Sequence, residues 1–352
     1  MKRVDKNETV RDLFAAECRA SGDAPRLAAW AALLEIADRI GITSQIETGS
    51  QFKVDDLCAS TGLPAEGLAG FCEALEVAAL IRPVDGATAT TGPFVAVDGF
   101  KQIQHQAGFL SWTMNANRPF IENASKFLAD PARPSGVGLR DGREVAVSSQ
   151  WMGSKAFYPA ALRTILERRP KKVVDLGSGT CRLLIEILLT LPGCEAVGLD
   201  LDPAACREAR EAADRAQVGD RLTVLERPIQ SIADEPGPLR DADVVHGGFV
   251  FHDMFPEEKT TASKVLLNCN QAIRPGGIVA ITEAVPYVKN DRERQFSAIV
   301  TYYHRQFMKR KLLTEAEWTA TLHEAGFEPI EAVELAFPTG RLFIGHKGGS
   351  GA

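Results

Sequence analysis

The chain has 352 residues, of which 45% are hydrophobic and 24% charged, and its formal net charge is -6. This length is sufficient for two domains. The acidic balance and the lack of a long basic run argue against nucleic acid as a partner. No apolar run is long enough to span a membrane. The charged first ten residues are unlike a signal peptide, and seven cysteines without a C-x-x-C pair are typical of reduced thiols, so we expect a cytoplasmic protein.

Residues 1–100 are predicted to form a helical domain that ends in a β-hairpin. Apolar residues recur at helical spacing from Val10 to Phe14 and over residues 27–40, and two further helices follow. The hairpin is predicted over residues 80–91, with its turn at Asp85-Gly86. Helices followed by such a hairpin form a winged-helix arrangement. Because the segment is not basic, the sequence favours a scaffold over a DNA-binding domain.

Residues 101–165 are predicted to be helical and to bridge two domains. They contain several aromatic residues and a Pro/Gly-rich loop, Pro131 to Gly142, that carries Arg140. Aromatic side chains over a loop with arginines suit a lid on a small anionic substrate. The alternative is that the aromatic residues form core at a domain interface, and we expect this for most of them.

Residues 166–347 alternate predicted strands and helices. The predicted strands are 172–176, 196–200, 222–225, 243–246, 278–283, 328–335 and 341–346. This alternation predicts an α/β fold with a Rossmann-like, doubly wound sheet of seven strands, the last two forming an antiparallel edge hairpin. Ligands of such sheets bind at the carboxyl ends of the strands.

The first of these strands runs into the turn Gly177-Ser178-Gly179, and the second ends on Asp200. Glycines allow a ligand to approach the backbone closely, and an acid at the end of the second strand can accept hydrogen bonds from ribose hydroxyls. Arg182 replaces the third glycine of the dinucleotide pattern G-x-G-x-x-G. Asp175, just before the turn, would repel phosphates and attract an ammonium group. The stretch therefore predicts a site for a cationic nucleoside with an amino acid tail.

This stretch resembles the first motif, D-x-G-x-G-x, of the class I S-adenosylmethionine-dependent methyltransferases. The resemblance implies that the winged-helix domain forms a homodimer and that four residues bind S-adenosylmethionine: Asp175, Gly177, Gly179 and Asp200. The family often has Gly-Asp after the third strand, where the acid meets the adenine amine. Here Glu226-Arg227 follows that strand, which leaves Gln230 or main-chain atoms as adenine partners.

His252 and Asp253 lie just past the predicted end of the fourth strand, where a methyl acceptor must meet the methyl donor. An imidazole among phenylalanines is costly to desolvate without a partner, so we expect His252 to have a function. One possibility is a general base that takes a hydroxyl proton, with Glu283 as a candidate to orient it. This arrangement resembles the plant-type small-molecule O-methyltransferases. The other possibility is a metal ligand, with His304 as the second ligand.

A further resemblance favours the metal. The segments FHDMFP and YHRQFM, whose histidines are 52 residues apart, are similar to those of the α-keto acid C3-methyltransferases of the phenylpyruvate C-methyltransferase type. The resemblance implies that His252 and His304 bind a non-haem iron or another transition metal, and that the keto and carboxylate oxygens of the substrate chelate it. It also implies that Trp112 and Arg140 contact the substrate. Asp253 would position a water or assist proton removal.

The sequence thus predicts an S-adenosylmethionine-dependent C-methyltransferase. It would methylate the C3 carbon of a 2-oxo acid through a metal-stabilised enolate, in the biosynthesis of β-methyl amino acids or peptide antibiotics. The alternative is a metal-free O-methyltransferase with His252 as base. A winged-helix regulator that keeps the cofactor fold as a ligand sensor would need a basic recognition helix, which the sequence lacks. The remaining histidines, 105, 246, 323 and 346, are predicted to be structural or exposed.

Overall fold

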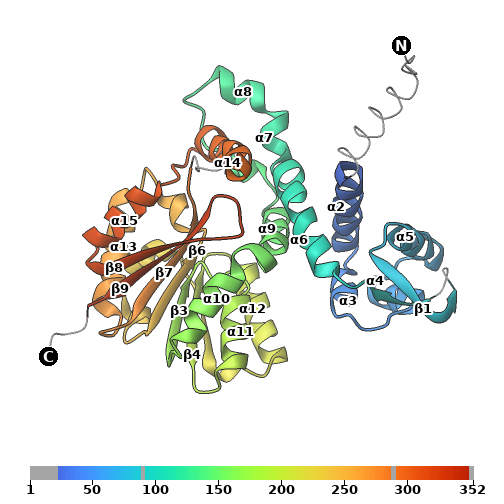
Figure 1. Ribbon diagram of the computed structural model, residues 1–352, viewed down its shortest axis with the longest axis horizontal. Helices are drawn as coiled ribbons and strands as arrows, with labels where there is room; N and C mark the ends of the chain where they lie inside the picture. The colour runs from blue at the N-terminus through green and yellow to red at the C-terminus, as the bar shows by residue number, and fades with distance from the viewer. Residues whose placement is uncertain (1–22, 89–91, 287–290, 349–352) are drawn as a thin grey trace, which may run out of the picture. The chain divides into compact units, whose positions relative to one another are not determined.

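The computed structural model describes residues 23–88, 92–286 and 291–348 (Figure 1). The chain separates into two compact units, which are treated individually below. The first comprises the chain up to Ile121 together with Arg140–Lys155, and the second comprises Glu122–Leu139 and the chain from Ala156 onward. The three-part division predicted from the sequence, with boundaries at residues 100 and 165, stays a prediction.

The first unit begins with helices and a two-stranded antiparallel sheet. Its elements are α2 (Asp23–Arg39), α3 (Thr43–Glu47), α4 (Val54–Thr61), α5 (Ala65–Val77), β1 (Ile81–Thr88) and β2 (Gly92–Ala96). Apolar side chains from these helices form a buried core with Phe52 and Phe94. Helices followed by a hairpin agree with the predicted order. The helix predicted from Val10 to Phe14 lies outside the described residues.

The predicted hairpin turn at Asp85-Gly86 is wrong. Strand β1 continues through these two residues to Thr88. The register shifts between Pro83, which pairs with Phe94, and Thr88, which pairs with Gly92. This irregularity lets the longer strand absorb extra residues, so the local turn preference of Asp-Gly is overridden by strand pairing.

The segment predicted to be helical between residues 101 and 165 is helical. It contains α6 (Phe100–Leu110), the π-helix η1 (Ser111–Ala116), α7 (Arg118–Glu122), α8 (Ala124–Ala129), the 3₁₀-helix η2 (Val137–Leu139), α9 (Gly142–Ala156) and α10 (Tyr158–Glu167). A π-helical turn widens the helix locally and often marks a functional site. Trp112 lies in such a turn.

The second unit is built on a seven-stranded sheet, as predicted (Figure 1). Its strands are β3 (Lys172–Leu176), β4 (Glu195–Asp200), β5 (Leu222–Glu226), β6 (Val244–Gly248), β7 (Ile278–Ala284), β8 (Phe327–Glu334) and β9 (Gly340–Lys347). Their order is β5-β4-β3-β6-β7-β9-β8. The pairs from β5 to β7 are parallel, and β9 is antiparallel to both β7 and β8. The strand order agrees with the predicted α/β fold with a doubly wound sheet.

Helices cover both faces of this sheet (Figure 1). They include α11 (Arg182–Thr190), α12 (Pro203–Arg215), α13 (Lys259–Ala272) and α15 (Glu315–Glu324). The second unit also contains α14 (Asp291–Tyr302), which lies beyond the end of the sheet in Figure 1. Val174, Leu176 and Val245 belong to the large buried cluster that includes residues of α13 and α15. Because side chains alternate along a strand, Asp175 and His246 point to the opposite face of the sheet.

The helix predicted over residues 292–311 ends earlier than expected. Regular α-helix stops at Tyr302, a π-helix (η7, Tyr303–Phe307) follows, and the chain beyond it is irregular. His304 lies in this second π-helix, where the widened turn changes the direction of the side chains relative to a regular α-helix.

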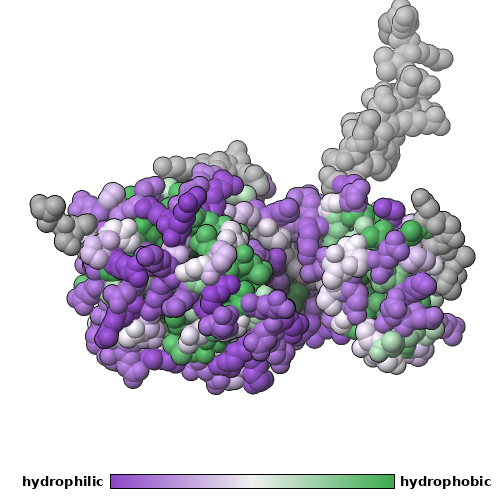
Figure 2. All heavy atoms as spheres, turned by 90° about the horizontal axis from the view of Figure 1, so that it is seen from below, coloured by the Kyte–Doolittle hydropathy of each residue, from purple (hydrophilic) through white to green (hydrophobic). Residues whose placement is uncertain are grey.

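The face of the molecule seen in Figure 2 is mostly polar. Figure 2 shows hydrophilic side chains over much of the visible face, with apolar side chains in small groups between them. None of the helices within the described ranges combines the length and the apolar character that crossing a membrane requires.

Candidate functional site

The glycine turn after β3 is held tightly against the end of β4. The main-chain N–H groups of Gly177 and Ser178 both donate to the Leu199 carbonyl, each at 2.8 Å. Gly177 has φ of +73°, and a Cβ atom there would lie 2.7 Å from Cγ2 of Val250. Any other residue at this position would be unfavourable for two reasons: the positive φ angle, and a steric clash between its Cβ atom and Val250.

The Asp200 carboxylate lies directly beside this turn. Its Oδ2 accepts from the Gly179 N–H at 2.7 Å, and its Oδ1 accepts from the Asp202 N–H at 2.9 Å. These two hydrogen bonds fix the carboxylate at the carboxyl end of β4, where an acid can accept hydrogen bonds from ribose hydroxyls. The structure thus brings Gly177, Gly179 and Asp200 together, in the arrangement that a nucleoside site requires.

A cavity of about 270 Å³ opens at this edge of the sheet. Its lining residues are Gly177, Asp200, Leu201, Ile229, Gln230, Gly248, Phe249, Val250 and Asp253. Four of the residues singled out from the sequence therefore share one cavity: Gly177, Asp200, Gln230 and Asp253. The amide nitrogen of Gln230 donates to Glu258 at 2.8 Å, which orients the side chain. Asp175 is absent from the lining.

Asp175 is instead buried and paired with a histidine that sequence reasoning had not assigned to the site. Its Oδ1 lies 2.7 Å from His246 Nδ1, and the two residues are 4% and 5% exposed. The pairing follows from sheet register, because Asp175 on β3 lies opposite His246 on β6. Aligning the ends of the predicted parallel strands would have pointed to this neighbour.

His252 follows β6, in the 3₁₀-helix η6 (Phe251–Met254). Its Nδ1 lies 2.8 Å from Oε2 of Glu283, and the other oxygen of that carboxylate accepts the main-chain N–H groups of Phe251 and His252 at 2.9 and 3.2 Å. Glu283 is fully buried on β7. The carboxylate thus fixes both the backbone and the imidazole ring, as the sequence suggested for Glu283.

The pair with Glu283 changes the acidity of His252. Burial by itself lowers the pKa of the imidazole, but the charge and hydrogen bond of Glu283 outweigh it, and Asp253 adds to their effect. The pKa of His252 rises from its ordinary 6.5 to about 9. An imidazole in this environment holds a proton, or another cation, more strongly than one in water.

His304 lies against His252. The two ring centroids are 4.9 Å apart and the ring planes are nearly perpendicular, at 82°. His304 is buried, with 6% of its surface exposed, and its Nδ1 donates to the Val300 carbonyl at 2.7 Å. The two histidines predicted to act together, 52 residues apart in sequence, are therefore neighbours in space.

Asp253 completes this group at its exposed side. Its Oδ1 lies 3.7 Å from His252 Nε2 and 3.3 Å from Nε of Arg310, and its side chain is 54% exposed. Arg310 was not predicted, because it lies in irregular chain beyond the second π-helix. Its guanidinium fixes the carboxylate near the imidazole.

The donor set fits a metal with two protein ligands. Each Nδ1 is engaged, His252 with Glu283 and His304 with Val300, so in the neutral tautomers the lone pairs lie on the Nε2 atoms. Metal-ligating histidines characteristically donate their second ring nitrogen to a carboxylate or carbonyl in this way. No group of three or more metal-ligating side chains is found within the described ranges.

Trp112 and Arg140 belong to the first unit, whereas the two histidines belong to the second. They are joined through Asn117, whose side-chain nitrogen donates to the Trp112 carbonyl at 2.8 Å and whose oxygen accepts from Arg140 at 3.2 Å. The Arg140 guanidinium also lies over the Phe120 ring, 5.3 Å from its centroid. Asn117 is fully buried and was not predicted.

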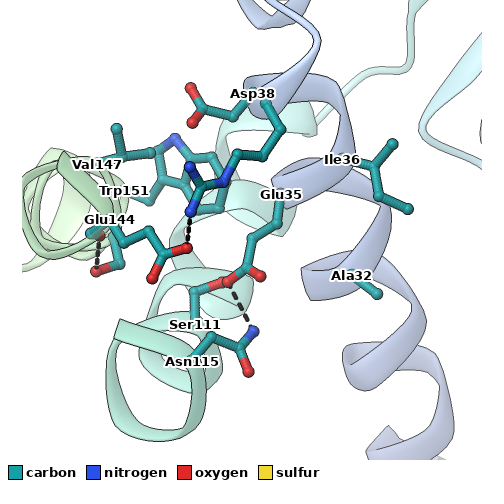
Figure 3. Close-up of a pocket in the computed structure, with 11 residues that line it drawn as sticks. Ala32, Glu35, Ile36, Asp38, Ser111, Asn115, Glu144, Val147 and Trp151 are labelled. Atoms are coloured by element: carbon teal, nitrogen blue, oxygen red, sulfur yellow. Dashed lines mark hydrogen bonds and ion pairs between the residues drawn. The ribbon is translucent and has the colours of Figure 1, made fainter. Parts of the chain in front are cut away.

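The first unit has its own cavity of about 410 Å³ (Figure 3). It lies between α2, η1 and α9, and its lining includes Glu35, Arg39, Ser111 and Glu144. Several of its charged side chains have partners within the lining. Arg39 forms an ion pair with Glu144, and Glu35 accepts a hydrogen bond from the Asn115 amide at 2.7 Å. None of the residues predicted for binding or catalysis lines this cavity.

Residues 174–279 match the model of a family described as a methyltransferase domain. The chain contains a class I, S-adenosylmethionine-dependent methyltransferase domain. This match spans the glycine turn, Asp200 and His252. Domains of this class transfer a methyl group from S-adenosylmethionine, and the turn at Gly177 and the Asp200 carboxylate both lie within the matched residues.

Other similarities agree with the methyltransferase domain. A ribosomal protein L11 methyltransferase of Pasteurella multocida is 25% identical over 200 residues, which cover 56% of this chain and 55% of that protein. The chain thus spans about half the length of the curated relatives that it matches.

Solved structures resemble nearly the whole chain. Human N-acetylserotonin methyltransferase in complex with S-adenosylmethionine has a TM-score of 0.56 at 13% identity, covering 99% of each chain. An O-methyltransferase family protein from Burkholderia thailandensis has a TM-score of 0.54 at 15% identity, covering 97% of this chain and 99% of that one. At these identities the similarity shows the fold.

Proposed function

We propose that the methyltransferase methylates the C3 carbon of a 2-oxo acid, with a transition metal, such as non-haem iron, held by His252 and His304. The observation that carries this proposal is the pair of imidazoles, 4.9 Å apart, whose Nδ1 atoms are both anchored. A histidine that served only as a base would need no second imidazole against it. Packing alone would not require that both Nδ1 atoms be engaged.

The proposed roles follow from the chemistry of the substrate. The C3 carbon of a 2-oxo acid becomes a nucleophile only as its enol or enolate. A bound metal would act as a Lewis acid that stabilises this form at the keto oxygen. Glu283 holds the ring of His252 in the tautomer that presents Nε2, and the Val300 carbonyl does the same for His304. Asp253, 3.7 Å from His252 Nε2, is the nearest exposed carboxylate for moving the C3 proton.

In this proposal Trp112 and Arg140 are the residues that contact the substrate. Arg140 binds the carboxylate of the 2-oxo acid through its guanidinium, which suits a carboxylate because two parallel N–H groups can donate to two oxygens. Asn117 holds both Arg140 and the main chain at Trp112, so these two residues act as one group. The products would be precursors of β-methyl amino acids, such as those of peptide antibiotics.

A second candidate function is metal-free O-methylation with His252 as general base. The His252–Glu283 pair supports it, because a carboxylate that raises the pKa of an imidazole to about 9 also makes that imidazole a stronger base. In this reading His304 is a packing neighbour. The O-methyltransferase family protein of similar fold is compatible with either chemistry, because the same fold hosts many acceptors.

Two measurements separate these functions. Elemental analysis of the purified enzyme should find about one transition metal per chain, lost in both His252→Ala and His304→Ala. NMR of the product formed from phenylpyruvate, indolepyruvate, branched-chain or guanidino 2-oxo acids should locate the new methyl group on C3. Full activity in excess chelator, or a methyl group on oxygen, would exclude the C-methylation proposal in favour of the second candidate.

We also propose that the enzyme acts as a homodimer through its N-terminal helices and hairpin. Light scattering of the full chain should give about twice the chain mass of 38.1 kDa. A monomer that is fully active at working concentration would contradict this proposal.

A further inference from the structure

His246 has a buried ring nitrogen without a hydrogen-bond partner among the described residues. Its Nδ1 is bonded to Asp175, but its Nε2 makes no hydrogen bond among the described residues, although His246 is 5% exposed. A buried polar atom without a partner is costly, so such an atom in a native structure calls for an explanation, such as a ligand group. The mechanism proposed above does not use this histidine.

The position of His246 indicates which ligand group this is. A Cβ atom added to Gly248 would lie 3.2 Å from Cε1 of His246 and 3.8 Å from its Nε2. Gly248 lines the cofactor cavity, together with Gly177 and Asp200. The Cε1–Nε2 edge of the imidazole therefore lies next to Gly248, which lines the cavity and has no side chain to separate the ring from it.

The order of the strands gives the orientation of the methyl donor. Asp200 on β4 and Gln230 after β5 line one end of the cavity, and Gly248 on β6 lines the other. With the ribose at Asp200, the adenine lies toward Gln230. The amino acid tail then extends over the ends of β3 and β6, which is where Asp175 and His246 face each other.

We propose that His246 accepts a hydrogen bond through Nε2 from the ammonium group of S-adenosylmethionine, and that Asp175 is the positioning residue for this contact. Asp175 accepts a hydrogen bond from the Nδ1–H group of His246, so Nε2 of the neutral imidazole is left as an acceptor. The ammonium group, with three N–H donors, is the donor on the amino acid tail. The buried carboxylate supplies the opposite charge. This inference rests on the methyl donor alone and is independent of the methyl acceptor and of the metal.

Calorimetry with truncated ligands tests the contact. The ligands are S-adenosylhomocysteine, its analogue without the carboxylate, its analogue without the amino group, and 5′-methylthioadenosine, which lacks the tail. His246→Asn keeps a donor for Asp175 and removes the acceptor at the position of Nε2. It should weaken binding of the two ligands that keep the amino group by about tenfold or more, and leave the other two unchanged. His246→Gln, which carries an acceptor to about the position of Nε2, should recover part of the loss.

A matched control is His346→Asn. His346 is also bonded to a carboxylate, Glu331 at 3.0 Å, but it pairs with Ile278 at the start of β7, the opposite edge of the sheet from the cavity. This variant should bind all four ligands like the unmodified enzyme. Undiminished binding of 5′-methylthioadenosine shows that the His246 variants are folded. Equal losses for all four ligands, no loss for any, or a loss that follows the carboxylate would each overturn the proposal. None of these outcomes depends on which acceptor is methylated.

Discussion

The cofactor cradle and the two-histidine site lie at the same edge of one sheet, but they are built in different ways. The cradle comes from two consecutive strands and the turn after the first of them. Its contacts are hydrogen bonds from main-chain N–H groups, to the Leu199 carbonyl and to the Asp200 carboxylate. The histidine site joins side chains from three separate elements: η6, η7 and β7. The residues proposed to bind the methyl donor are therefore close in the sequence, whereas those proposed for the acceptor chemistry are brought together by long-range packing.

The largest expected effect concerns the histidine site itself. If both imidazoles bind a metal, His252→Ala and His304→Ala should each lower kcat by a factor of about 10² to 10⁴, the range typical for loss of a central catalytic group. If His252 is only a base, His304→Ala should leave most of the activity. Steady-state kinetics with saturating S-adenosylmethionine make the comparison. His323→Ala, at an exposed position, is the control and should be unchanged.

Arg140 gives the next effect, because it tests whether the first unit takes part in acceptor binding. Arg140→Ala should raise KM for the 2-oxo acid by about 10- to 100-fold, since a charged hydrogen-bond partner is lost. The Kd for S-adenosylhomocysteine should stay the same. Arg143→Ala, a nearby arginine that is bonded to Asp38, serves as the control. A change in cofactor affinity without a change in KM would show that Arg140 is assigned to the wrong ligand.

Asp200 tests the cradle independently of the acceptor. Asp200→Asn should raise the Kd for S-adenosylhomocysteine about tenfold, because the amide accepts less strongly from ribose hydroxyls than a carboxylate does. The rate should recover at high S-adenosylmethionine. Asp202→Asn is the matched control, since Asp202 caps α12 by accepting from the Ala204 N–H. It should affect only stability, and a similar loss of affinity in both variants would contradict the assignment.

The smallest expected effect is on stability as a function of pH in the metal-free protein. The pKa of His252 is raised to about 9 from 6.5, so its charged pair with Glu283 stabilises the folded state fully below about pH 6.5. This contribution is lost as the pH rises from 6.5 to about 9. Thermal unfolding should therefore show a melting temperature that falls by a few degrees over this interval. Glu283→Gln should flatten the change, and an equally steep curve in that variant would argue against the pair.

Much of the second unit was accessible from the sequence. Short runs bounded by turns predicted all seven strands. The signal was clearest for β7, which is apolar for most of its length because it is buried on both faces, whereas β8 at the edge of the sheet is mostly exposed. Local signals were less dependable where tertiary pairing competed with them. Asp85-Gly86 favours a turn locally, yet strand β1 runs through it. The helix over residues 292–311 was predicted too long, because apolar periodicity does not reveal where an α-helix widens into a π-helix.

The candidate site shows the same limits. His252 and His304 were predicted as a pair from short segments that resemble known enzymes, and their rings are in contact range. Arg310 and Asn117 were missed, because no local pattern marks a residue that acts by holding another. His246 was predicted to be structural or exposed, and it is buried and paired with Asp175, a partner that the sequence did not indicate.

For the turn and the acid that are proposed to bind the methyl donor, local sequence was informative. A strand, a glycine turn and an acid at the end of the next strand are neighbours in the chain and fold into neighbours in space, so their order predicts the cradle around Gly177 and Asp200. For the other groups, packing was decisive. Glu283 meets His252, and Asp175 meets His246, because parallel strands distant in sequence are aligned in register. Such contacts arise only when the sheet assembles, since each strand places its side chains relative to partners that its own sequence does not specify.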